Sequence, residues 1–134
     1  MTVQAVEILT NCPDAGSAER IAEALIEDRL AACANIGAPI RSLYRWKGEI
    51  AREPETPLLL KTRAELFAPL AERLRDLHPY ETPAVLRLDV AEADADYLAW
   101  IEAETRALSR ARSAQDWLSF HSSTSARTSS LLLP

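Results

Sequence analysis

Two strand–helix–strand patterns joined by a hairpin predict an α+β fold of the ferredoxin-like, split βαβ type. The expected order is β-α-β-β-α-β, followed by a third helix. Such a chain forms an antiparallel sheet with helices on one face. The other face would stay exposed in a monomer, and we expect Tyr44, Trp46 and the run 58–60 to lie there. An exposed apolar face of this size predicts a homo-oligomer.

The composition is that of an ordinary soluble protein. The 134 residues are 48% hydrophobic and 26% charged, which is too apolar for a disordered chain. The formal net charge of −5 argues against nucleic-acid binding, because phosphate neutralisation requires a basic face. The sequence has neither a run of roughly 20 apolar residues nor a basic signal region, so we expect a cytoplasmic protein without a membrane segment.

The domain is expected to end near residue 108. Residues 1–108 carry the strand and helix patterns, whereas residues 109–134 are rich in Ser, Thr and Arg. We interpret 109–134 as a tail that is either disordered or docked on a neighbouring subunit.

The first strand is expected over residues 2–10, where apolar side chains alternate and then become continuous. Turn residues follow, and Asp14 can cap a helix that we expect over 18–29. The run 30–36 is small and apolar, and Cys33 within it is expected to be a buried free thiol. Cys12 and Cys33 are too far apart for a C-x-x-C site.

A hairpin is expected next. Period-two alternation predicts a strand over 40–46, and the turn 47–49 leads into a returning strand that extends to about residue 62. Pro54 and Pro57 interrupt this second strand, so we expect its first part to be an edge extension or bulge and 58–61 to be central.

A second helix is predicted by leucines at positions 66, 70, 74 and 77. Thr62 and Glu65 have the spacing of a capping box. Pro69 conflicts with that start, so the helix either begins later or bends there.

A last strand is expected over 85–90, and a third helix from 95 to about 106. Asp94 can cap this helix, and Leu98, Ile101 and Leu108 are expected to face inward.

The turn 77–83 contains several side chains that can take part in ligand binding or proton transfer. Its two prolines fix φ at about −65° and make the turn stiff. His78 precedes the first proline, and Tyr80 and Glu81 lie between the two, so the turn either redirects the chain or holds these side chains for a ligand. Lys61 ends an apolar strand, where an ammonium needs a partner. It either pairs with Glu81 or binds an anion.

Several ordered motifs indicate a family. SLYRWKGEI at 42–50 follows LAACANI at 30–36 and precedes LKT at 60–62, HPYETP at 78–83 and DYLAWI at 96–101. With these motifs, the chain resembles the CutA family of divalent-cation tolerance proteins over about residues 1–108. The resemblance implies a tight homotrimer with an architecture similar to that of PII signalling proteins. It also implies a cleft between subunits where five side chains gather: Trp46, Lys61, His78, Tyr80 and Glu81.

The resemblance further implies a link to metal tolerance and copper binding. His78, Glu81 and Cys12 are the candidate metal ligands, since copper favours imidazole and thiolate groups. Family members discussed as copper binders can carry Cys where this chain has Thr10, and Glu where it has Ala84. We expect no required cofactor, and copper(II) or another divalent cation as the ligand.

Three functions stay open. The first is a trimeric binding or regulatory protein with a divalent cation in the cleft, or a PII-like binder of a small anionic ligand, with Trp46, Lys61, Tyr80 and Glu81 as ligand-binding residues. The second is an enzyme that uses His78 and Glu81 as acid and base, although the sequence has no nucleophile or phosphate-loop motif. The third is a scaffold that presents its surface or tail to other proteins. We favour the first and therefore expect no enzymatic activity.

Overall fold

The computed structural model describes residues 3–107, so the predicted tail and the inward position of Leu108 lie outside the described residues. The predicted ferredoxin-like α+β fold is confirmed: strands pair in the order β2-β4-β1-β5, antiparallel throughout, and β3 also pairs with β4. The elements in chain order are β1 (Ala5–Cys12), α1 (Ala15–Glu27), β2 (Cys33–Ile36), β3 (Ile40–Trp46), β4 (Glu49–Arg63), a 3₁₀ turn (Ala64–Leu66), α2 (Phe67–Leu77), β5 (Leu86–Asp89) and α3 (Ala95–Glu104).

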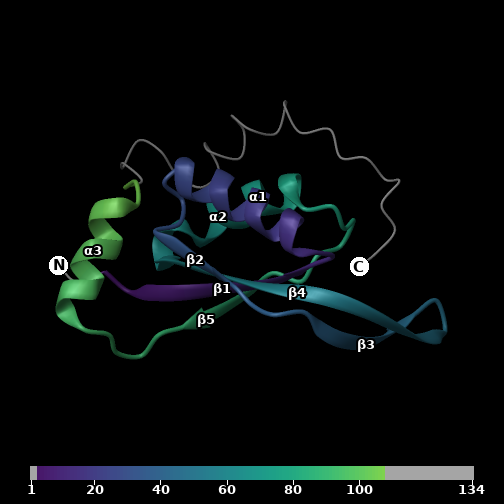
Figure 1. Cartoon of the computed structure of the whole chain (residues 1–134). Coiled ribbons are helices and arrows are strands. Elements are labelled where there is room, and N and C mark those ends of the chain that lie inside the picture. Colours follow the sequence, from purple (N-terminus) through teal and green to yellow (C-terminus); the bar gives the residue numbers. More distant parts are fainter. Residues whose placement is uncertain (1–2, 108–134) are drawn as a thin grey trace.

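The core lies between the sheet and two helices. α1 and α2 lie side by side over one sheet face, and α3 sits at the end of the sheet that is far from the β3–β4 turn (Figure 1). Alternation along β1 and β4 directs Ile8, Leu58 and Leu60 toward the helices, where all three are fully buried. On the other sheet face, Ile101 of α3 packs on Ala5. Leu98 is partly buried in the same cluster, so the predicted inward face of α3 is confirmed within residues 3–107.

The long strand β4 builds the hairpin that projects beyond the sheet (Figure 1). Its inner half pairs with β1 and β2, so the predicted central position of 58–61 is confirmed. Its outer half pairs with β3, and Pro54 lies there opposite Arg41. The predicted edge extension is confirmed, because residues 49–55 of β4 pair with β3 and not with β1 or β2, and a strand with an open edge has room for a proline there. Lys47 and Gly48 have φ of 51° and 81°, the left-handed backbone of a tight hairpin turn.

Several predicted boundaries shift for local reasons. α1 begins at Ala15 rather than residue 18, since Asp14 accepts a 2.7 Å hydrogen bond from the Ser17 N–H. Thr62 does not cap α2; it is a buried β4 residue whose hydroxyl donates to the Leu30 carbonyl at 2.7 Å. The α-helix begins at Phe67, so the alternative of a later start is confirmed and Pro69 falls in its first turn.

The exposed apolar surface differs from the prediction. Leu58 and Leu60 are buried, and Tyr44 and Trp46 are half-buried. The residues left on the uncovered sheet face, called here the open sheet face, are Leu9, Leu59, Leu86 and Leu88, of which Leu86 is 54% and Leu88 46% exposed. The prediction failed because it treated the run 58–60 as a single surface, although side chains alternate across a strand.

The environment of Cys33 also differs from the prediction. Cys12 ends β1 and is buried, whereas Cys33 is half-exposed, with its Sγ 3.8 Å from the Tyr97 hydroxyl. The prediction of a buried Cys33 is therefore wrong for a single chain. Within residues 3–107, no helix is long and apolar enough to cross a membrane.

Candidate functional site

The stiff turn after α2 is anchored by His78. Its Nε2 donates to the Asn11 carbonyl at 2.8 Å, and its Nδ1 accepts the Tyr80 N–H at 3.1 Å. Because a carbonyl can only accept and a backbone N–H can only donate, these two bonds place a proton on Nε2 and none on Nδ1. The ring is 7% exposed and lies 4.8 Å from the Tyr80 ring, centroid to centroid. His78 therefore ties the turn to β1 and fixes the position of Tyr80.

Tyr80 links the turn to the β3–β4 hairpin. Its side chain is 5% exposed, and its hydroxyl donates to Glu55 Oε2 of β4 at 2.8 Å. Burial raises the pKa of Tyr80 strongly, and the hydrogen bond to the Glu55 carboxylate raises it further. The phenol therefore stays protonated at neutral pH and holds the Glu55 carboxylate in place.

A cavity of about 550 Å³ lies between the β3–β4 hairpin and the turn. Tyr44 and Trp46 of β3 line it, together with Glu55 and Tyr80. Burial raises the pKa of Tyr44, and the carboxylates of Glu53 and Glu55 add to the effect. We call this cavity the hairpin hollow; its lining also includes Asn11, Ser42, Leu43, Arg45, Thr82, Pro83 and Ala84. It combines aromatic walls with a fixed carboxylate.

The three predicted metal ligands are not gathered into a preformed site. Burial, followed by the charges of Asp14 and Glu55, raises the pKa of the Cys12 thiol from 9.0 to about 12. Metal binding needs the thiolate, so Cys12 is a poor ligand here. Both ring nitrogens of His78 contact the backbone, and Glu81 is exposed on the turn. No group of three or more His, Cys, Asp and Glu side chains suited to a metal occurs within residues 3–107.

Lys61 lies away from the hairpin hollow. Its Nζ is 3.8 Å from Glu7 Oε2, which gives it a different partner from the expected Glu81. Both residues line a second cavity of about 380 Å³, beside Tyr97 of α3. The structure thus brings Trp46 and Tyr80 together at the hairpin hollow, places His78 against Tyr80, and separates Lys61 from that group.

Glu55 and Asn11 were missed by the sequence analysis. Glu55 reaches the turn because β4 places Thr56 opposite Cys12 of β1 and Glu55 opposite Ile40 of β3. Local patterns do not reveal such a register. The only signal was a carboxylate between two prolines in a strand that was expected to be irregular. Asn11 accepts the hydrogen bond of His78 through its backbone carbonyl. Every residue type has such a carbonyl, so the sequence gives no sign of this contact.

Comparisons with known proteins give a consistent picture. A family model described as "CutA1 divalent ion tolerance protein" matches residues 6–104. The "Divalent-cation tolerance protein CutA" of Pyrococcus horikoshii is 42% identical over 99 residues, which cover 74% of this chain and 96% of that protein.

Solved structures agree in fold. CutA1 from Ehrlichia chaffeensis superposes with a TM-score of 0.76 at 32% identity, covering 80% of this chain and all of that one. A protein from Archaeoglobus fulgidus, named as a periplasmic divalent cation tolerance protein CutA, superposes with a TM-score of 0.74 at 34% identity. That match covers 76% of this chain and 99% of the other.

Proposed function

This chain belongs to the CutA1 divalent ion tolerance family, and we propose that it acts as a homotrimer that binds a divalent cation, such as copper(II), at the hairpin hollow. The cation is the ligand to which the protein responds. It is not a resident cofactor, and we propose no enzymatic activity.

The observation that carries the proposal is the Glu55 carboxylate held by Tyr80 at the hairpin hollow. A carboxylate fixed by a buried donor loses little conformational freedom when it binds a cation. Glu81 adds a second, exposed carboxylate on the turn that forms one wall. One fixed carboxylate is too few for a tight site, because divalent cations take four or more ligands. A neighbouring subunit at the projecting hairpin would supply the others.

The trimer is supported by apolar surface that one chain leaves uncovered. The open sheet face presents Leu86 and Leu88, and the rings of Tyr97 and Trp100 stack beside one another on the exposed side of α3. Contiguous apolar surface of this kind is typical of subunit interfaces.

A cation is favoured over the alternative ligand and over catalysis. Lys61 was the residue that motivated an anion, but Glu7 balances its charge and it lies outside the hairpin hollow. His78 motivated acid–base catalysis, but its nitrogens hold the backbone of β1 and of the turn.

Calorimetric titration of copper(II) into the metal-free protein tests the proposal. We expect saturable binding with a fixed number of ions per trimer, weakened at least tenfold in Glu55→Gln, because the amide removes the charge that attracts the cation. Glu102→Gln, which makes the same change on the exposed side of α3, is the matched control and should bind as the unsubstituted protein does. Equal binding in all three proteins would contradict a site at the hairpin hollow.

A further inference from the structure

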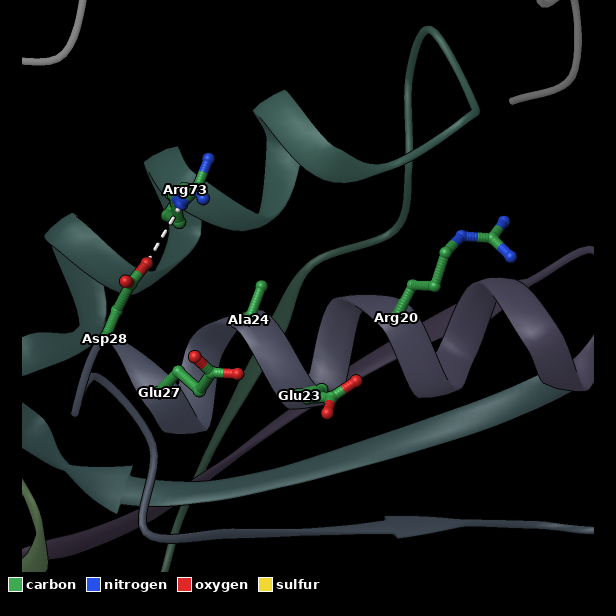
Figure 2. A pocket seen from close by; sticks show the side chains of 6 residues that line it. All are labelled: Arg20, Glu23, Ala24, Glu27, Asp28 and Arg73. Carbon is green, nitrogen blue, oxygen red and sulfur yellow. Dashed lines mark hydrogen bonds and ion pairs between the residues drawn. The ribbon is translucent and has the colours of Figure 1, made fainter.

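Two hollows of the molecule differ in the chemistry of their walls. A groove of about 280 Å³ runs along α1 beside α2, and its lining is charged except for Ala24 (Figure 2). Arg73 Nε in that groove already lies 3.0 Å from Asp28 Oδ2. The hairpin hollow instead combines a carboxylate with aromatic residues, Tyr44 and Trp46. Of these two, the hairpin hollow is the one that suits an organic ligand.

The hairpin hollow has two chemically different ends. Glu55 lies at one end, because β4 places it opposite Ile40 of β3. Tyr44 follows Ile40 by four residues and Trp46 by six, which are about 13 Å and about 20 Å along a strand. All three residues line the hollow. It is therefore elongated, with a carboxylate at one end and aromatic rings along the rest.

The two aromatic side chains lie on the same face of the hairpin as Glu55. Residues directly opposite each other in an antiparallel pair point to one side, as do alternate residues along a strand. Tyr44 and Trp46 are in step with Ile40, the partner of Glu55, and both are half-buried. Arg45 also contributes to the lining, but alternation directs its side chain to the other face.

The charge of Glu55 has no counterion within residues 3–107. Neither a lysine nor an arginine of this part of the chain forms an ion pair with it. The Tyr80 hydroxyl, which is neutral, donates to Oε2 and leaves Oε1 as an acceptor. Glu55 is half-buried, and a partly buried carboxylate is stabilised by a cation that hydrogen-bonds to it.

The Trp46 end suits an uncharged group. Lys47 Nζ lies 5.8 Å from the centroid of the Trp46 ring, so a second cation there would be repelled. The positive charge of a ligand therefore belongs at Glu55. The rings of Tyr44 and Trp46 are left for an apolar part, which they bind by burying hydrocarbon surface.

We propose that the hairpin hollow binds an amphipathic amine, with its ammonium group on Glu55 and its apolar tail along Tyr44 towards Trp46. The volume of about 550 Å³ is in the range of small-molecule sites. A single carboxylate balances the charge of such a ligand, so a neighbouring subunit need not supply further charged groups. The proposal goes beyond divalent ion tolerance and does not depend on metal binding.

Calorimetric titration of hexylammonium chloride into the metal-free protein, with a chelator present, tests the proposal. Hexanol keeps the tail without the charge, and methylammonium keeps the charge without the tail. A hydrogen bond to a charged group contributes about tenfold or more, so hexanol should bind at least tenfold more weakly. Burial of about two methylene groups contributes a similar factor, so methylammonium should also bind at least tenfold more weakly.

Two variants locate the ammonium group. Glu55→Gln should weaken hexylammonium binding at least tenfold. Glu49→Gln is the matched control, because Glu49 lies on the same strand opposite Trp46 and loses the same charge. It should bind within twofold of the unsubstituted protein, and circular dichroism should show both variants folded. Equal binding in Glu55→Gln and the unsubstituted protein, or weakening in Glu49→Gln alone, would overturn the proposal. So would hexanol binding as tightly as hexylammonium.

The hexylammonium and copper(II) titrations can fail independently. Copper bound through Glu55 without saturable hexylammonium binding would overturn the amine site and leave the proposed function intact. Hexylammonium bound through Glu55 without copper binding would support the amine site and contradict the proposed function.

Discussion

At the residue scale, one buried hydroxyl stands out. Thr10 lies on the core side of β1, and its Oγ1 has no hydrogen-bond partner among the described residues. A buried hydroxyl without a partner costs free energy relative to an apolar group of the same shape. Thr62, equally buried on β4, makes such a bond to Leu30.

Thr10→Val should therefore raise the free energy of unfolding by about 1 kcal/mol, whereas Thr62→Val should lower it by about 1 kcal/mol. Denaturant unfolding at one fixed protein concentration measures both, since the stability of an oligomer depends on concentration. A loss of stability in Thr10→Val similar to that in Thr62→Val would show that Thr10 has a partner in solution.

The thiol of Cys12 gives a second prediction at this scale. A pKa raised from 9.0 to about 12 lowers the thiolate fraction at pH 8 about a thousandfold. Because the thiolate is the nucleophile, iodoacetamide should label Cys12 at least a thousand times more slowly in the native protein than in urea. Peptide mapping by mass spectrometry follows each cysteine separately. Rapid native labelling of Cys12 would restore it as a candidate metal ligand.

At the element scale, the strands and helix caps that depend on local residue pattern could be predicted from the sequence. The alternation over 40–46 matches β3 at both ends, and Asp14 and Asp94 cap the helices expected after them. Features set by register were not predictable: Glu55 faces Tyr80 only because of the pairing of β4 with β1 and β3. The separation of Lys61 from the hairpin hollow also follows from β4, because Lys61 lies six residues from Glu55, about 20 Å along a strand.

The Asp14 cap makes α1 sensitive to acid. The hydrogen bonds from Ser17 lower the pKa of Asp14 below its usual value of 3.8. An acid with a lowered folded-state pKa stabilises the fold above the unfolded-state pKa and loses that contribution as pH falls through the folded-state value. Asp14→Asn keeps a capping side chain that does not titrate, so it is the matched variant.

The stability advantage of the unsubstituted protein over Asp14→Asn should therefore be present at pH 5 and shrink as the pH falls through and below 3.8. Chemical unfolding at several pH values measures it. A difference that does not change with pH would mean that the carboxylate charge has no role in the cap.

At the scale of the whole molecule, we expect the proposed trimer to depend on the open sheet face. Leu86→Glu places a charge on that face, and Ile26→Glu places one on an apolar residue of α1 that is 38% exposed on the helical side. Light scattering should give three times the 14.8 kDa chain mass for the unsubstituted protein and for Ile26→Glu, and a lower mass for Leu86→Glu. A trimer unaffected by Leu86→Glu would place the interface elsewhere.

In the proposed trimer, assembly and ligand binding are linked, because residues 3–107 of one chain offer a fixed carboxylate but no complete cation site. Anomalous diffraction from crystals of the full chain grown with copper(II) tests that link most directly. We expect copper at the hairpin hollow, bound by Glu55 and by at least one side chain of a neighbouring subunit. Copper bound wholly within one chain, or only at sites remote from Glu55, would contradict it.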